Sequence, residues 1–167
     1  MDKERVNVSV WCIVSLTSIP LIMTLGNSML IPVLPILEDK VGITSFQSSM
    51  IITSYSVAAI FLIPVAGYLS DRLGRKIVIL PSLILALIGG LIAGFASWKM
   101  DDPYAIIIAG RIIQGIGAAG AMPIVLPLVG DLYQDDDEKI SSTLGIIETS
   151  NTFGKVLSPI LGAFLAA

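Results

Sequence analysis

Long apolar runs separated by short polar connectors make up nearly the whole chain. There are five such runs, and they extend from about Val8 to Leu37, Phe46 to Leu69, Ile77 to Trp98, Tyr104 to Val129 and Ile140 to Ala167. Each reaches the ~20 residues that a helix needs to cross the hydrocarbon core of a bilayer. Because lipid offers the backbone no hydrogen-bond partners, runs of this length are expected to be helical. The pattern predicts an all-α, polytopic transmembrane bundle of about five helices.

Composition agrees with a membrane protein and excludes several other classes. Of the 167 residues, 54% are hydrophobic and 14% are charged, which is more apolar surface than a soluble domain of this size can bury. The net charge of -3 gives no reason to expect a nucleic-acid partner. There is no histidine, Cys12 is the single cysteine, and no metal-ligand cluster or nucleophile–base pair is found. We therefore expect no catalytic residue, no metal, no cofactor and no enzyme activity.

The basic residues predict the orientation of the spans. With the N-terminus inside the cell, the outer connectors hold only Lys40 and Lys99. The inner segments then hold Lys3, Arg5, Arg72, Arg75, Lys76 and Lys139. This imbalance follows the positive-inside rule. It predicts a multi-pass cell-membrane protein with a cytoplasmic N-terminus.

The connector Gly67–Lys76 is short, charged and placed between two apolar runs. Gly67 and Gly74 are expected to let the two helix ends approach and turn where a side chain would clash. Asp71 is expected near the start of the third span, where the helix dipole favours a negative charge. Arg75 is expected to reach Asp131 at the inner end of the fourth span. Two interpretations stay open: a latch that holds one conformation, or a basic loop that only sets topology.

Arg111 stands about a third of the way into an apolar run, with Gln114 three residues further on. Such an arginine is costly unless it faces a cavity or a partner; the alternative is that it snorkels to the outer surface. Asn27 is a polar residue at mid-membrane depth that either lines a pathway or bonds a neighbouring helix. Gln47 and Tyr55 are weaker candidates of the same kind.

Glu148 and Lys155 are seven residues apart in the fifth run and share one helix face. A buried carboxylate at Glu148 is suited to carry a proton, whereas a carboxylate near water at the cytoplasmic end of the span is not. Lys155 suits either an anionic or zwitterionic substrate group or a salt bridge to an acidic residue on another helix.

Three segments resemble motifs of the major facilitator superfamily. Residues 67–76 resemble its G-x-L-x-D-R-x-G-R-[RK] loop, and residues 111–119 resemble its fourth-helix motif R-x-x-Q-G-x-G-A-A. Residues 154–163 are similar to the fifth-helix motif G-x-x-x-G-P-x-x-G-G of its drug–proton antiporters, with Gly154, Pro159 and Gly162 in place. Lys155, Ser158 and Ala163 depart from that last motif, which weakens the link to the drug-antiporter subgroup.

The resemblance implies that residues 1–167 are the N-terminal transmembrane domain of a major facilitator transporter. Because the chain stops in apolar residues, we expect truncation before a sixth helix and a missing C-terminal transmembrane half. The implied function is proton-coupled efflux of small, drug-like molecules by alternating access, with the substrate, protons and the lipid bilayer as partners. The alternatives are a transporter of an anionic or lipid-like metabolite, or a truncated membrane protein that binds a partner without transport.

In this interpretation the candidate site residues form three groups with different roles. Arg111 and Glu148 are candidates for proton coupling, and Asn27, Gln114 and Lys155 for the substrate pathway. The gating group comprises Gly67, Asp71, Arg72, Gly74, Arg75, Lys76 and Asp131.

Overall fold

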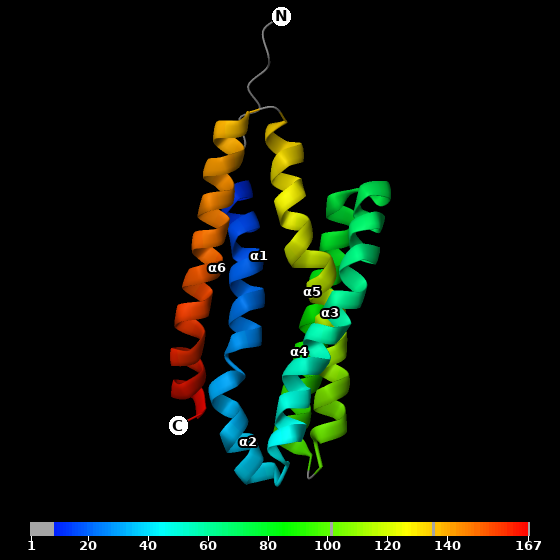
Figure 1. Ribbon diagram of the computed structural model, residues 1–167, viewed down its shortest axis with the longest axis vertical. Coiled ribbons are helices and arrows are strands. Elements are labelled where there is room, and N and C mark those ends of the chain that lie inside the picture. Colours follow the sequence, from blue (N-terminus) through cyan, green and yellow to red (C-terminus); the bar gives the residue numbers. More distant parts are fainter. Residues whose placement is uncertain (1–8, 101, 135, 167) are drawn as a thin grey trace, which may run out of the picture.

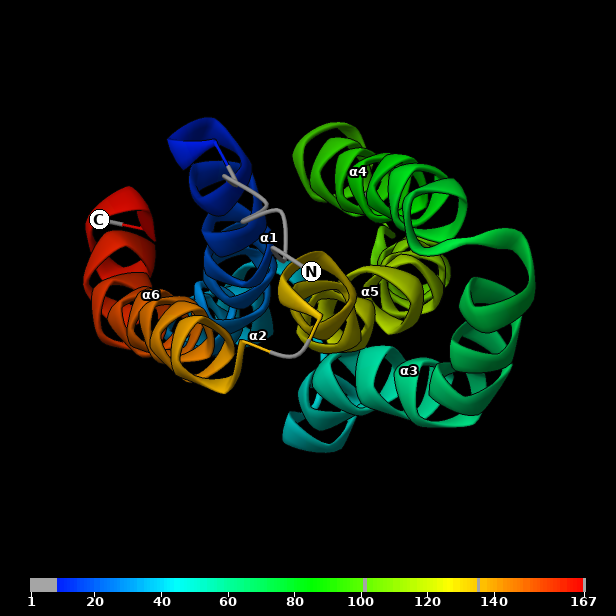
Figure 2. The same cartoon turned by 90° about the horizontal axis from the view of Figure 1, so that it is seen from above.

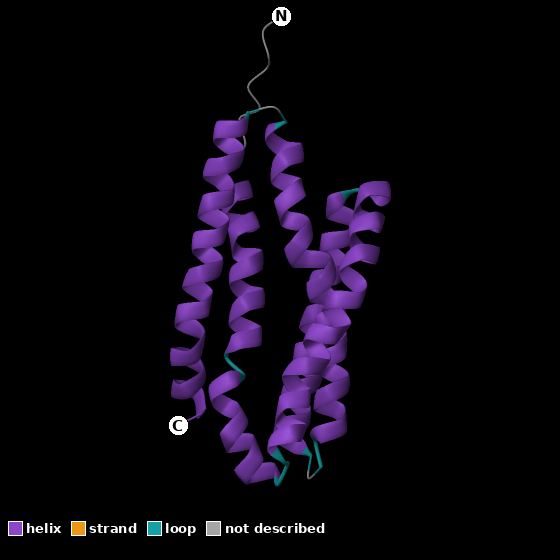
Figure 3. Cartoon of the chain, in the orientation of Figure 1, coloured by secondary structure: helices purple, strands orange, loops and turns teal. Residues whose placement is uncertain are grey.

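The computed structural model describes residues 9–100, 102–134 and 136–166. Residues 1–8, with Lys3 and Arg5, lie outside the described part. Within the described ranges the chain is helical and has no strand, as the all-α prediction requires (Figure 3). The elements are α1 (Val10–Ser28), the 3-10 helix η1 (Ile31–Val33), α2 (Leu34–Val41), α3 (Ser45–Leu73), α4 (Arg75–Lys99), α5 (Tyr104–Tyr133) and α6 (Asp137–Ala166).

Four helical units are long and apolar enough to cross a membrane, judged by length and composition. They are Val10–Val41, Ser45–Leu73, Arg75–Lys99 and Tyr104–Tyr133. The sequence pattern predicts five, and the difference is α6. This helix has 30 residues, as many as α5, but it carries Glu148, Asn151 and Lys155 along its middle. Its polar content, and not its length, separates it from the other four.

The first span is interrupted, whereas its apolar run predicts one continuous helix. The α-helical pattern stops after Ser28 and resumes at Leu34, with the short 3-10 turn η1 between the two parts. Pro32 lies in η1 and Pro35 in the first turn of α2, and neither has an amide hydrogen to continue the hydrogen-bond ladder of α1. Span one is therefore two helical pieces joined within the membrane segment.

The helices form two groups with α5 between them (Figures 1 and 2). On one side α5 packs closely along α3 and α4, and on the other α1 packs along α6. The last part of α5 also reaches the second group, where Val125 and Val129 join a buried cluster with Leu16 of α1 and Ile147 of α6. Side chains on α5 thus contact every other span, which places this helix at the centre of the candidate site.

The start of α3 is fixed by a capping box. The Thr44 hydroxyl accepts a hydrogen bond from the Gln47 amide, and the Gln47 side chain accepts one from the Thr44 amide. This reciprocal pair satisfies two backbone donors that the first turn of a helix otherwise leaves free. Gln47 therefore has a structural role at the start of α3, and its contribution to a pathway stays a prediction.

Candidate gate and coupling sites

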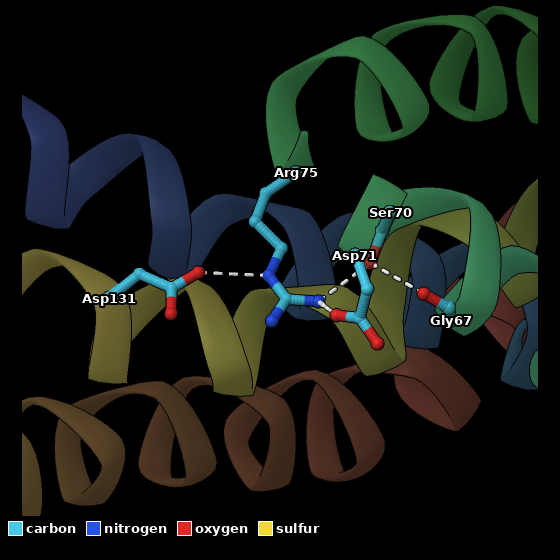
Figure 4. A network of polar contacts seen from close by, with 5 residues as sticks. All are labelled: Gly67, Ser70, Asp71, Arg75 and Asp131. Atoms are coloured by element: carbon cyan, nitrogen blue, oxygen red, sulfur yellow. Dashed lines mark hydrogen bonds and ion pairs between the residues drawn. The ribbon is translucent and has the colours of Figure 1, made fainter. Parts of the chain in front are cut away.

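The gate cluster consists of Ser70, Asp71, Arg75 and Asp131, at the end of the bundle where α3 meets α4 (Figure 4). The Arg75 guanidinium donates from Nε to Asp131 Oδ2 at 2.9 Å and from a terminal nitrogen to Ser70 Oγ at 2.7 Å. The same terminal nitrogen forms an ion pair with Asp71. One arginine thus joins α3, α4 and α5. The contact between Arg75 and Asp131 that the sequence predicts is present; its role as a latch stays a prediction.

The connector itself is shorter than the sequence predicts. α3 continues to Leu73 and α4 begins at Arg75, so Gly74 alone makes the turn. Its φ of 102° lies in a region that residues with a side chain rarely adopt, which explains the glycine. Gly67 is different: it is helical, and a methyl group there would have no heavy atom within 4 Å. The expectation of a close helix approach at Gly67 is therefore wrong.

Asp71 also lies elsewhere than expected. It is in the last turn of α3 and not near the start of the next span, so the dipole of its own helix disfavours its charge. The ion pair with Arg75 compensates for this. Arg72 and Lys76 are exposed, and the Arg72 guanidinium lies 4.8 Å from the centre of the Tyr68 ring. These two cations do not join the contacts of the gate cluster.

Arg111 is buried, with 1% of its surface exposed, and does not snorkel outward. Its Nε donates to the Ile51 carbonyl at 3.3 Å, and its two terminal nitrogens donate to Gln114 Oε1 and Asn27 Oδ1. The guanidinium also stacks 4.6 Å from the centre of the Tyr55 ring. We call this group the Arg111 cluster. It joins α1, α3 and α5, and these four partners of Arg111 are neutral.

The neutral partners of Arg111 have an energetic consequence. Removing a cation from water costs several kcal/mol, and neutral hydrogen bonds and a ring face offset part of that. Asn27 and Gln114, predicted as pathway residues, are here the groups that hold the arginine, and both are half-buried. Among the described residues no carboxylate forms an ion pair with Arg111. The positive charge of Arg111 is therefore only partly compensated, so a new charge nearby would change the stability of the cluster.

Close packing against α5 sets the position of Arg111. A methyl group on Gly115 would lie 2.3 Å from the Tyr55 carbonyl oxygen of α3. On Gly110 and Gly117 it would lie 2.7 Å and 2.4 Å from backbone atoms of α4. Glycine at these three positions lets three backbones touch, as small residues do in membrane helix pairs. The glycines of the motif after Arg111 thus hold its helix against both neighbours.

Glu148 lies on the exposed side of α6. Its Oε1 accepts a hydrogen bond of 3.2 Å from Asn151 Nδ2. Asn151 is buried and in turn accepts, at Oδ1, a hydrogen bond from the Thr24 hydroxyl of α1. Lys155 is also exposed, and the described part of the chain offers it no ion pair, so the predicted salt bridge to another helix is not seen there.

The fifth-helix motif packs α6 against α1. A methyl group on Gly162 would lie 2.5 Å from the Met29 carbonyl oxygen, and one on Gly154 would lie 3.3 Å from that of Leu21. Ser158, which replaces a glycine of the motif, is fully buried and donates to the Leu25 carbonyl at 3.0 Å. Pro159 faces outward. Gly154 and Gly162 therefore act in helix packing, and the departure at Ser158 adds an interhelical hydrogen bond.

Sequence reasoning missed Thr24 and Ser70, and it ranked Tyr55 too low. Each is a small polar or aromatic residue in an apolar run, of a kind that occurs at many lipid-facing positions as well. A signal is present for Thr24, because Thr24 and Asn27 are three residues apart and share a helix face. For Ser70 the signal is its place inside the charged connector motif.

A family model described as Major Facilitator Superfamily matches residues 16–167. The chain belongs to the major facilitator superfamily. This member is 65% identical to the bacillibactin exporter of Bacillus subtilis over 155 residues, which is 93% of this chain. It is 31% identical to a triacylglyceride transporter of Mycobacterium tuberculosis over 87% of the chain, and 25% identical to the quinolone resistance protein NorA of Staphylococcus aureus over 85%.

The superfamily member described here spans only part of the length of these relatives. The alignment covers 39% of the bacillibactin exporter, 28% of the triacylglyceride transporter and 35% of the quinolone resistance protein. The family assignment indicates a transporter and not an enzyme, which agrees with the composition. The gate cluster and the Arg111 cluster both lie inside the matched residues.

Proposed function

We propose that this chain forms the N-terminal transmembrane domain of a secondary transporter that exports small molecules in exchange for protons. The observation that carries this proposal is the burial of Arg111 among neutral partners at membrane depth. Ionisable residues inside a bilayer are costly and are found where ions or substrates pass. The side chains of Asn27 and Gln114 hold the Arg111 guanidinium. Binding of a proton or a substrate nearby would change these contacts, and in this way Arg111 would take part in transport.

In the proposed mechanism the gate cluster holds one conformation of an alternating-access cycle. Arg75 joins three helices through Ser70, Asp71 and Asp131, so α3, α4 and α5 stay together while these contacts persist. In the proposed cycle these contacts stabilise one conformation of the transporter and are weakened in the other. A proton or substrate drives this change only if it binds the two conformations with different affinity. We assign proton coupling to Arg111 and Glu148, and the substrate pathway to Asn27, Gln114 and Lys155.

The likeness to relatives named as an exporter and as a quinolone resistance protein supports the outward direction and small, drug-like substrates. The same proposal gives the cell membrane as the location, with the N-terminus and the gate cluster on the cytoplasmic side, because the basic residues collect there. The missing partner is the remainder of a transporter, against which this domain would rock about a central site.

A second candidate is the transport of an anionic or lipid-like metabolite on the same scaffold. Exposed Lys155 favours it, because a lysine at this depth attracts an anionic group, and one relative is named as a triacylglyceride transporter. Efflux of bacillibactin, a quinolone and a triacylglycerol from cells that express the complete protein separates the two candidates. Export of the triacylglycerol alone would favour the second.

Glu148→Gln is expected to remove the pH dependence of export. Glutamine keeps the size and hydrogen-bonding capacity of the side chain but binds no proton in the relevant range. Export by the complete protein is measured from mildly acidic to mildly alkaline pH, with Glu138→Gln, an exposed acid in the first turn of the same helix, as the control. An unchanged pH response in Glu148→Gln would remove Glu148 from the coupling mechanism.

A further inference from the structure

Two hydrogen bonds connect the exposed face of α6 to the interior of α1. The Thr24 hydroxyl donates to Asn151 Oδ1, and Asn151 Nδ2 donates to Glu148 Oε1 at 3.2 Å. Thr24 and Asn151 are 8% and 4% exposed, so these two side chains satisfy their hydrogen bonds with protein groups and not with water. The Glu148 side chain is exposed. A proton-binding group thus has a direct, buried link to the neighbouring helix.

The same helix carries the contact to Arg111. Asn27 follows Thr24 by three residues, about 4.5 Å along the axis of α1, and residues with this spacing are neighbours on a helix surface. The Asn27 side chain accepts the hydrogen bond from Arg111. Glu148 and Arg111, which belong to α6 and α5, are therefore connected through a single turn of α1. Neither residue contacts the other directly.

We propose that Asn151 and Thr24 are positioning residues that pass the protonation state of Glu148 to α1 and from there to Arg111. This inference rests on the proposed proton coupling and assigns a part of it to two residues that bind neither substrate nor proton. The argument depends on the asymmetry of the Asn151 amide, which has a donor end and an acceptor end.

The ionised Glu148 carboxylate can only accept hydrogen bonds, so it attracts the Asn151 NH2 group and leaves Oδ1 facing Thr24. Once Glu148 takes up a proton, its hydroxyl becomes a donor and the reversed amide becomes favourable. Asn151 Oδ1 then accepts from Glu148, and Asn151 Nδ2 donates to Thr24 Oγ1. The only proton gained is the one on Glu148. In both arrangements the Asn151 amide bonds to Glu148 at one end and to Thr24 at the other, so the amide has two well-defined states.

The hydrogen bond that the Thr24 hydroxyl of α1 donates differs between the two states. In the first, the Thr24 hydroxyl donates to Asn151. In the second, that hydroxyl is free to donate to the carbonyl of Pro20, four residues earlier in the same helix. Hydrogen bonds of this kind bend helices, and Pro20 already weakens the ladder at this point. A change of bend between Pro20 and Asn27 would alter the contact with Arg111.

Few other charges lie close enough to act in place of Glu148. Within its described length α1 has no charged side chain, and its titratable residue is Cys12, near the start. Lys155 is two turns along α6, about 10 Å away in helix rise, and Lys139 is about 13 Å away in the other direction. α5 packs against α6 mainly near Val129, where Asp131 and Tyr133 follow. Arg111 of α5 reaches α1 instead.

Another hydrogen bond between the same two helices supplies a matched control. Ser158 donates to the Leu25 carbonyl at 3.0 Å, so it ties α6 to α1 at nearly the same level as Thr24. Its acceptor is a backbone carbonyl, which cannot reverse its polarity. Loss of this bond weakens the packing of α1 on α6 but leaves the Glu148 connection in place.

The test measures bacillibactin-driven proton movement and its pH profile in liposomes that contain the complete protein. Wild type is compared with Thr24→Val, which keeps the shape of threonine but has no hydroxyl, with Thr24→Ser, which restores it, and with Ser158→Ala. If wild-type exchange varies about tenfold across the pH range, Thr24→Val is expected to vary less than about twofold. Thr24→Ser and Ser158→Ala are expected to keep the wild-type profile, and Asn151→Leu to match Thr24→Val.

The outcomes separate the relay from the proposed function. A pH profile that survives in both Thr24→Val and Asn151→Leu, while Glu148→Gln abolishes it, overturns the relay and leaves proton coupling intact. No proton movement in the wild type overturns both. A double variant, Thr24→Val with Glu148→Gln, should lose no more of the pH dependence of exchange than Glu148→Gln alone. The effects of two substitutions in one pathway are not additive. Additive losses would also contradict the relay.

Discussion

Arg75→Ala is expected to reduce transport by about tenfold or more while the protein still inserts into the membrane. The substitution removes the contacts to Ser70, Asp71 and Asp131 at once, so the gate cluster no longer favours one conformation. Its effect on the free energy of unfolding should stay below about 1 kcal/mol, since both acidic partners are more than half exposed. Export and membrane insertion are measured together. Asp71→Asn is expected to act in the same direction.

Lys139→Ala is the matched control for the gate cluster. Lys139, in the first turn of α6, also forms a partly exposed ion pair, with Asp136 just before that helix at 3.0 Å. This pair joins neighbouring residues and does not hold separate helices together, so its loss should leave export unchanged. Full transport by both Arg75→Ala and Asp71→Asn would contradict the latch and return the connector to a role in topology alone.

Gly117→Ala is expected to cause a large loss of stability. The new carbon would lie 2.4 Å from the Ala86 amide nitrogen and 2.5 Å from the Ser82 carbonyl oxygen. Both are backbone atoms of α4, so no side-chain rotation relieves the clash and the two helices must separate. Overpacking of this kind costs about 1–3 kcal/mol or more. The loss of stability is measured as a decrease in the temperature at which the complete protein unfolds in detergent.

Gly130→Ala on the same helix tests whether crowding is the cause. A methyl group at Gly130 has no heavy atom within 4 Å, and alanine is a better helix former than glycine. The unfolding temperature of this variant should be unchanged or slightly higher. An equal loss in the two variants would mean that α4 and α5 are not in close contact at Gly117.

The features predicted best from sequence are those that lie near the ends of the helices. Short connectors force neighbouring helix ends together, so the pairing of Arg75 with Asp131 follows from which ends share a membrane surface. The five helical segments follow from run length alone. The turn at Gly74 agrees with the prediction, but the connector is shorter and Asp71 lies in α3, because a charged segment resembles a loop although helices extend beyond the hydrocarbon into water.

The interior of the site was harder to predict for a physical reason. In water, the apolar stripe of a helix tells which face is buried, but in lipid the exposed face is apolar too. The rotation of α6 about its axis is therefore not visible in the hydrophobic pattern, which leaves both a buried and a solvated Glu148 open; in the structure this residue is exposed. For α5 the glycines mark the packed face, and Arg111 is buried there among its neighbours, which is one of the two positions that the sequence leaves open.

The most direct test of proton-coupled export uses liposomes that contain the complete protein and a pH-sensitive dye in their lumen. The compound that cells expressing the complete protein are found to export is added outside, and its entry and the pH of the lumen are followed together. Proton exchange predicts that entry of this compound is accompanied by loss of protons from the lumen, and that both rates fall by about tenfold or more in Arg75→Ala. Entry of the compound with no change in lumen pH would contradict the account.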